Sequence, residues 1–133
     1  MVKVSLTGIL ILLVTQICRA QAPQALDIQE TGSCTNAPDP YLSPDSLKLE
    51  RLPAGLVAVA TASLNCGSSV EATVLATRGV VSIALSQSFH AGASVAGCNC
   101  MRTFRLTLPR SIGSKTPVYL VNQGQGTAHA IAP

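Results

Sequence analysis

The sequence predicts an all-β protein, an antiparallel β-sandwich that occupies residues 46–133. About seven short runs rich in aliphatic and β-branched residues follow one another at roughly ten-residue spacing, which is typical of sandwiches and barrels. Turn-forming residues separate these runs, and several of them alternate apolar with polar residues, as half-buried strands do. No stretch of the domain has the spacing of an amphipathic helix.

Residues 1–20 are predicted to be a cleaved signal helix. Lys3 provides the positive charge, the run LTGILILLV is apolar, and Ala20 is a small residue suited to cleavage. The apolar run is about half of the roughly 20 residues that a membrane span needs, so an uncleaved anchor is the weaker reading. We therefore expect an exported, periplasmic or extracellular protein, more typical of bacteria, with no transmembrane segment in the mature chain.

Removal of the signal changes the charge and the cysteine count. The chain has nine basic and six acidic residues, and loss of Lys3 and Arg19 leaves seven against six, so the net charge falls from +3 to +1. A nucleic-acid partner is therefore not indicated. Loss of Cys18 leaves Cys34, Cys66, Cys98 and Cys100. An even number in an exported chain predicts two disulfides, for which three pairings exist.

Residues 21–45 are predicted to form an extended, proline-rich arm that Cys34 ties to the domain. The domain after it is expected to contain strands near 46–50, 56–64, 70–77, 81–85, 103–108, 118–121 and 127–131. The turn at Thr77-Arg78-Gly79 predicts a hairpin, and the continuously apolar run 118–121 is expected to be buried on both faces. Alanine is expected at several core positions, so the predicted core is thin. Disulfides then matter more for stability, and each contributes roughly 2–4 kcal/mol to the free energy of unfolding.

In strand number and spacing, residues 46–132 resemble small exported immunoglobulin-like sandwiches. The resemblance rests on no motif, because the chain has no tryptophan to pack beside an inter-sheet bridge. A sandwich of this kind implies no particular function.

The segment Cys98-Asn99-Cys100 precedes the most regular alternating stretch, in which Phe104 and Leu106 share one face. Both cysteines have the parity of Phe104, so their sulfurs are expected to point toward the core. A direct bridge between them would close a strained ring, so each is expected to bridge a different partner. We expect Cys66 to pair with one of the two and Cys34 with the other.

Two functional alternatives compete with this structural interpretation. Cys98, Cys100 and Met101 offer soft sulfur ligands to Cu(I), with His90 or His129 as a further ligand. Met101 has the opposite strand parity, so all three sulfurs converge only if the strand is irregular. The pair could also act as a redox dithiol, which would need an exposed, activated thiolate. The leading interpretation includes no cofactor.

No catalytic constellation accompanies the two histidines. His90 and His129 lie among small residues, the last aspartate is Asp45 and the last glutamate is Glu71. A catalytic histidine needs an orienting carboxylate and a nucleophile nearby. The sequence therefore predicts a non-enzymatic protein.

Charge is unevenly distributed along the mature chain. Residues 21–71 hold six acids and two bases, giving −4, whereas residues 72–133 hold five bases and no acid, giving +5. A face around Arg102, Arg105 and Arg110 could bind a polysaccharide, a membrane surface or an acidic protein. Arg105 should face solvent, and Arg102 is expected at a strand end or with its side chain reaching outward. The sequence thus predicts an interaction or structural module with an unidentified protein or polysaccharide partner.

Overall fold

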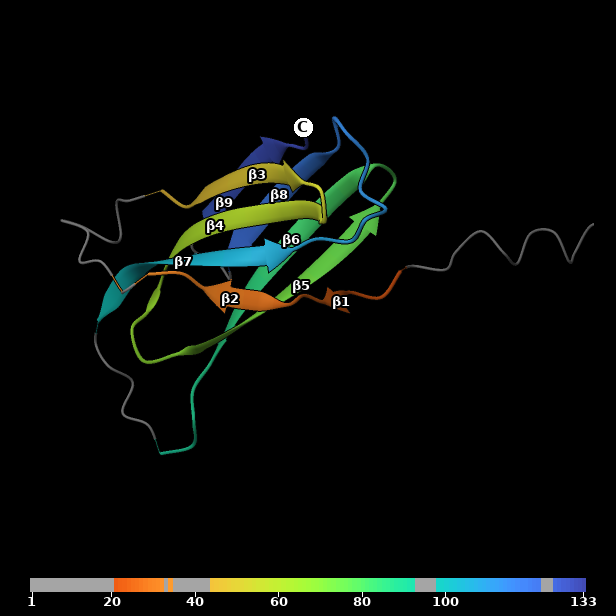
Figure 1. Cartoon of the computed structure of the whole chain (residues 1–133). Helices are drawn as coiled ribbons and strands as arrows, with labels where there is room; N and C mark the ends of the chain where they lie inside the picture. Colours follow the sequence, from red (N-terminus) through yellow and green to blue (C-terminus); the bar gives the residue numbers. More distant parts are fainter. Residues whose placement is uncertain (1–20, 33, 35–43, 93–97, 123–125) are drawn as a thin grey trace, which may run out of the picture.

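The computed structural model describes residues 21–32, 34, 44–92, 98–122 and 126–133 (Figure 1). These residues form strands and connecting segments, with no helix among them, and the predicted all-β class is confirmed. In this part of the chain no helix is long and apolar enough to cross a membrane. The predicted signal helix, residues 1–20, lies outside the described residues.

The described residues form nine strands in two sheets. In chain order they are β1 (Gln24–Ala25), β2 (Ile28–Glu30), β3 (Ser46–Leu52), β4 (Gly55–Asn65), β5 (Ser69–Thr77), β6 (Val80–Ser88), β7 (Asn99–Thr107), β8 (Pro117–Asn122) and β9 (Gly126–Ile131). One sheet has the order β1-β5-β6-β8-β9 and the other the order β2-β7-β4-β3. The two sheets cover one hydrophobic core, to which β4 and β7 contribute from one side and β5, β6 and β8 from the other.

The N-terminal arm takes part in both sheets. Strand β1 pairs with β5 in one sheet, and strand β2 pairs with β7 in the other. Each has only two or three residues, too few for an alternating pattern to be recognised in the sequence. Residues 24–25 and 28–30 of the predicted arm therefore extend the two sheets.

One strand pair departs from the predicted antiparallel order. Strands β6 and β8 are parallel, with Ile83 opposite Leu120. The strand between them in sequence, β7, belongs to the other sheet, so the chain crosses the core once and returns in the direction of β6. A parallel pair requires such a crossover. The expectation of a wholly antiparallel protein was therefore wrong at this pair.

The predicted hairpin of β5 and β6 is confirmed. Thr77 pairs with Val80, and the two connecting residues, Arg78 and Gly79, have φ angles of 45° and 81°. Positive φ at both central positions is the geometry of a type I′ turn, whose twist matches that of the flanking strands.

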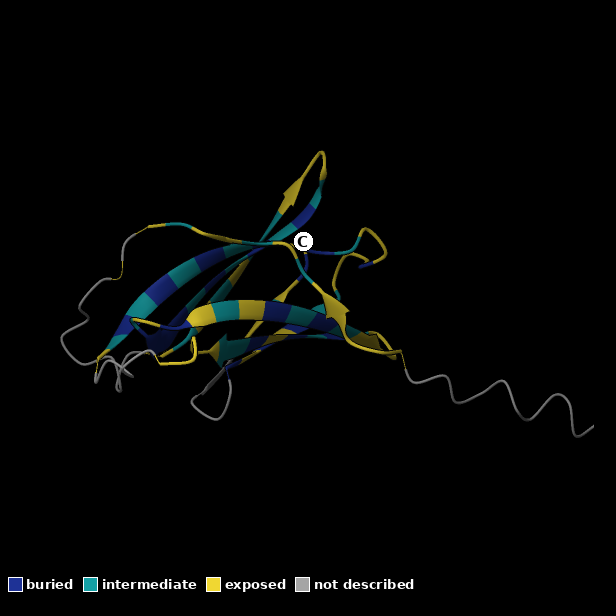
Figure 2. Ribbon diagram, turned by 90° about the horizontal axis from the view of Figure 1, so that it is seen from below, coloured by how far each residue is buried: buried dark blue, intermediate teal, exposed yellow. Residues whose placement is uncertain are grey.

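Alanines on β4 make room for large neighbours on β7. Ala58, Ala60 and Ala62 are fully buried and lie opposite Leu106, Phe104 and Arg102 in the strand register. Small side chains on the inward face of β4 thus lie opposite large side chains on the inward face of β7. Figure 2 shows the resulting alternation of buried and less buried positions along the strands. Close packing requires that small and large side chains alternate in this way.

Strand β8 is buried on one face only. Val118 and Leu120 are fully buried, but Tyr119 and Val121 are 40% and 39% exposed. The prediction that this strand is buried on both faces was wrong. No second layer of described residues covers the outer side of the five-stranded sheet at these positions, so its apolar side chains stay in contact with solvent.

Candidate functional site: a disulfide-bridged polar cluster

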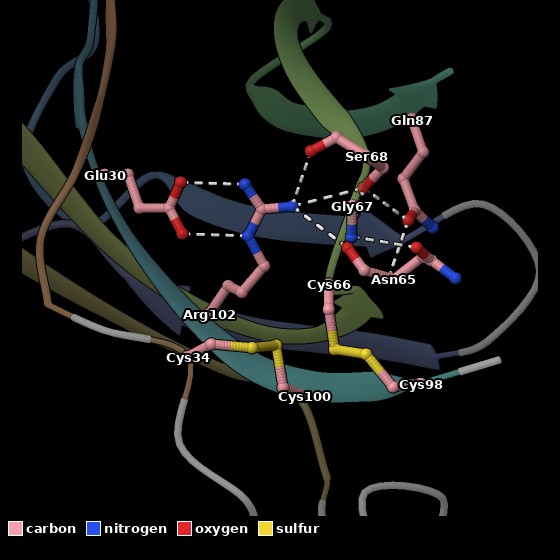
Figure 3. Close-up of a disulfide and its surroundings, with 10 residues drawn as sticks. All are labelled: Glu30, Cys34, Asn65, Cys66, Gly67, Ser68, Gln87, Cys98, Cys100 and Arg102. Atoms are coloured by element: carbon pink, nitrogen blue, oxygen red, sulfur yellow. Dashed lines mark hydrogen bonds and ion pairs between the residues drawn. A yellow bond between two sulfur atoms is a disulfide. The ribbon is translucent and has the colours of Figure 1, made fainter. Parts of the chain in front are cut away.

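Two disulfides lie side by side at one end of the four-stranded sheet (Figure 3). One joins Cys34 to Cys100 and the other joins Cys66 to Cys98, with Cα–Cα distances of 5.6 and 5.8 Å. The predicted framework of two bridges, in which the Cys-x-Cys pair reaches two different partners, is confirmed.

Strand register determines this pairing. Strand β7 lies between β2 and β4 in its sheet. In the β4–β7 ladder Asn65 lies opposite Asn99, so the next positions are Cys66 and Cys98, and the amide N–H of Cys66 donates to the carbonyl of Cys98 at 3.1 Å. The bridge between Cys66 and Cys98 therefore continues the β4–β7 ladder by one residue pair.

The second bridge follows the same rule on the other side of β7. In the β2–β7 ladder Glu30 lies opposite Phe104, and the amide N–H of Thr31 donates to the carbonyl of Thr103 at 2.8 Å. Extending that register by four residues brings position 34 opposite position 100. The two cysteines of the Cys-x-Cys motif thus fix β7 to both of its neighbours.

The two cysteines differ in burial. Cys100 is fully buried on the core face of β7, whereas Cys98 precedes the first residue of the strand and is exposed. The expectation that both sulfurs point into the core therefore holds only for Cys100. Strand alternation applies within a strand and does not extend to a residue outside it.

Arg102 forms the centre of a polar cluster beside these bridges. Its Nε and Nη2 donate to the two carboxylate oxygens of Glu30 at 2.8 and 2.7 Å. Its Nη1 donates to the carbonyls of Asn65 and Ser68 at 3.2 and 2.9 Å and to the hydroxyl of Ser68 at 3.1 Å. The guanidinium carbon also lies 5.4 Å from the centre of the Phe104 ring, a cation–π distance.

Arg102 is buried, contrary to the expectation that it would reach outward. Its side chain is 9% exposed. A buried guanidinium is tolerated only when its donors are satisfied, and Glu30 together with the carbonyls of Asn65 and Ser68 satisfies them. Arg102 therefore cannot contribute to an exposed face for an anionic partner.

The turn between β4 and β5 is held by its own hydrogen bonds. The amide N–H groups of Asn65 and Gly67 donate to Oε1 of Gln87 and Oδ1 of Asn65, at 2.8 and 3.0 Å. The Ser68 hydroxyl lies 2.9 Å from both Gln87 Oε1 and the Asn65 carbonyl. These bonds hold in place the two carbonyls that accept from Arg102.

Glu30 is held in its charged form by this arrangement. The pKa of its carboxyl is lowered chiefly by the hydrogen bonds from Arg102, and the positive charge of Arg102 lowers it further. Partial burial acts in the opposite direction, because it disfavours the charged form. The net direction shows that the ion pair outweighs the loss of solvation.

Sequence reasoning missed Glu30, Asn65, Ser68 and Gln87 as members of this cluster. One signal was present: Arg102 has core parity within an alternating strand, and a cation at a buried position requires an acidic partner. Nothing in the sequence indicated which acid it was, because the pair spans 72 residues.

Of the candidate metal ligands Cys98, Cys100, Met101 and His90, the sulfur group found among the described residues contains Cys100 alone. The sulfurs of Cys34, Cys66 and Cys100 lie within 4.8 Å of one another. Met101 is on the opposite face of β7 from Cys100, and the described part of the chain places no histidine in this group. His90 is exposed beyond the end of β6, and His129 on β9 stacks on Tyr119 with ring centres 5.9 Å apart.

The other two arginines of the predicted anionic-partner face, Arg105 and Arg110, lie in different parts of the fold. Arg105 lies on the outer face of the four-stranded sheet, 3.7 Å from Glu50. Arg110 lies in the connection between β7 and β8, at the end of the sheets remote from the disulfides. Of the three arginines predicted to share a face, Arg105 and Arg110 are thus at least partly exposed, whereas Arg102 is buried.

Comparison with known proteins adds no relative: no family model, no curated protein and no solved structure matches the chain. The class that the fold and this cluster define is a two-sheet β protein with two register-matched disulfides.

Proposed function

We propose that the chain is an exported, non-enzymatic interaction or structural module. The observation that carries this proposal is the pair of disulfides that fasten β7 to both neighbouring strands. Disulfides form and persist in oxidising compartments, which supports a periplasmic or extracellular location. Within the proposal, residues 1–20 are a cleaved signal peptide.

The polar cluster supports a structural role for this end of the molecule. Arg102 directs its hydrogen bonds to the arm through Glu30 and to the β4–β5 turn through Asn65 and Ser68. Together with the bridges it links the arm, the central strand and the turn. We further propose an immunoglobulin-like sandwich, for which the number and spacing of the strands over residues 46–131 is the support.

Expression of the full chain in an exporting host tests this proposal. The mature protein should begin at Gln21, appear outside the cytoplasm and contain no free thiol after denaturation. A variant with Leu10→Arg and Leu12→Arg in the apolar run should remain inside the cell with its signal uncleaved. Retention of the unchanged chain in the cytoplasm, or free thiols in the exported protein, would contradict the proposal.

A copper-binding protein is the second candidate, and the sulfur geometry favours a ligand set other than Cys98, Cys100, Met101 and His90. The reduced chain would present the thiolates of Cys34, Cys66 and Cys100, with Cys98 adjacent to Cys66. Soft thiolates suit Cu(I).

Titration with Cu(I) against a chromophoric competitor separates the two candidates. A copper protein should be isolated with free thiols that Cu(I) protects from alkylation, and Met101→Leu should leave its affinity unchanged. If the protein as isolated has no free thiol and binds no Cu(I), the copper candidate is rejected.

A further inference from the structure

Four exposed cations gather at the end of the sheets that is remote from the disulfides. Within the described ranges, Lys48, Arg102 and Arg105 each have a carboxylate within 4.0 Å. Among the described residues, Arg51, Arg78, Arg110 and Lys115 form no ion pair with an Asp or Glu side chain, and all four are exposed. We call these four residues the basic end.

Topology explains why they lie together. Strands β4 and β7 have their disulfide-linked residues at one end, so the turn between β3 and β4 and the connection between β7 and β8 lie at the other (Figure 1). Strand β5 starts near the bridged end, so the turn at Arg78 also falls at the remote end. Arg51 and Arg110 are separated by 59 positions in sequence but line one groove of about 210 Å³.

Arg51 and Arg110 come from the two opposite walls of the chain around this groove, the end of β3 and the β7–β8 connection. Arg51 donates from Nε to the main-chain oxygen of Pro133 at 2.9 Å. That bond occupies one of the five N–H donors of the group and leaves the others for a ligand. Arg110 lays its side-chain stem over the hairpin, where its Cγ is 3.9 Å from the position that a Cβ of Gly55 would occupy. Guanidinium groups bind anions with bidentate geometry, such as a carboxylate or sulfate, and two arginines line this groove.

A second open groove, of about 300 Å³, lies on the other side of the β7–β8 connection. Arg78 lines it together with the hydroxyl-bearing Thr77, Ser111 and Thr116 and the amide of Gln21. Cations combined with hydroxyl and amide groups can bind both the acidic groups and the hydroxyls of a sugar chain.

We propose that the basic end is a binding site for an acidic polysaccharide, with the groove of Arg51 and Arg110 taking one carboxylate or sulfate group. This inference rests on the proposed interaction module and identifies its partner by chemistry. A polymer that carries charges at regular intervals can contact the arginines of both grooves at once. An anionic lipid surface is the competing partner, and the experiment below distinguishes it.

Binding of the mature, disulfide-bonded protein to dextran sulfate, measured by calorimetry at low ionic strength, tests the site. Uncharged dextran is the negative control. The double variant Arg51→Gln/Arg110→Gln should weaken binding by roughly tenfold, because exposed charge pairs each contribute up to a few-fold. The control Lys48→Gln/Arg105→Gln removes the same charge from the outer face of the four-stranded sheet and should change affinity by less than twofold.

A single variant and a comparison with lipid vesicles complete the experiment. Arg110→Gln alone, which leaves the bond between Arg51 and Pro133 in place, should weaken binding by about threefold and keep the circular-dichroism spectrum unchanged. Equal losses in the two double variants would overturn the site, as would absence of binding to dextran sulfate or binding confined to phosphatidylglycerol vesicles. If the folded protein has no free thiol and yet fails to bind, the site is rejected while the proposed module stands.

Discussion

Arg102 and Glu30 are joined by two parallel hydrogen bonds, of 2.8 and 2.7 Å, across 72 residues of sequence. The pair connects the arm strand β2 to the central strand β7, close to the bridge between Cys34 and Cys100. A backbone ladder, an ion pair and a disulfide therefore hold the same segment. The arm depends on all three, and each can be removed separately.

Glu30→Ala should lower the free energy of unfolding by about 2 kcal/mol, because it leaves a buried guanidinium without its counter-charge. The loss is smaller than for a fully buried pair, since the Glu30 side chain is 39% exposed. Urea denaturation of the disulfide-intact protein measures the change. Glu71→Ala removes an exposed acid from β5 and is the matched control, with an expected change below about 0.5 kcal/mol. Equal effects of the two variants would show that the pair contributes nothing specific.

The same pair predicts a pH dependence. The folded state lowers the pKa of Glu30, so the unfolded chain binds the proton more tightly, and the stability from this group is fully present above its unfolded pKa of about 4.3. It is lost as the pH falls through the lower, folded pKa. The difference in stability between the unchanged protein and Glu30→Gln should therefore shrink from pH 6 toward pH 2.5. A difference that stays constant over this range would contradict the assignment.

Removal of either disulfide should destabilise the protein by about 4 kcal/mol, because it frees the unfolded chain. The bridge between Cys66 and Cys98 lies inside the loop that Cys34 and Cys100 close and shortens it, so the two losses should be similar. The variants are the alanine pairs at positions 34 and 100 and at positions 66 and 98, and thermal or urea unfolding compares them. A variant as stable as the unchanged protein would show that the corresponding bridge is dispensable.

Ala60→Leu should destabilise the protein by roughly 1–3 kcal/mol through overpacking. Ala60 is fully buried opposite Phe104, and added methylene groups have no space there. Val59→Leu, on the outer and partly exposed side of the same strand, is the control and should be close to neutral. If Ala60→Leu raises the unfolding midpoint, the core has unfilled space beside Ala60 and the overpacking prediction is wrong.

Local pattern was sufficient for the strands from residue 46 onward. Alternation and turn chemistry located each of them, including the hairpin closed by Arg78 and Gly79. Local pattern did not predict those features of the fold that depend on residues distant in the sequence. The direction of β8 relative to β6 follows from the placement of β7 in the other sheet, and the exposure of Tyr119 follows from the lack of a covering layer there.

The candidate site was predictable in composition but not in geometry. An even cysteine count indicated two bridges, whereas the choice of partners follows from the registers of β7 with β2 and β4, which the sequence does not reveal. The partner of Arg102 was hidden for the same reason, because β2 is too short to be recognised as a strand. Arg102, Arg105 and Arg110 were grouped because residues 72–133 hold bases and no acid, although only Arg110 belongs to the basic end.

A non-reducing peptide map shows whether Cys98 and Cys100 fasten two different strands to β7. Trypsin does not cut between the two cysteines, so residues 79–102 should remain linked to the peptide containing Cys34 and to residues 52–78. Fragmentation of the backbone at Asn99 should leave the Cys66 peptide on Cys98 and the Cys34 peptide on Cys100. The opposite assignment, a direct link between Cys98 and Cys100, or free thiols at these positions would contradict the account.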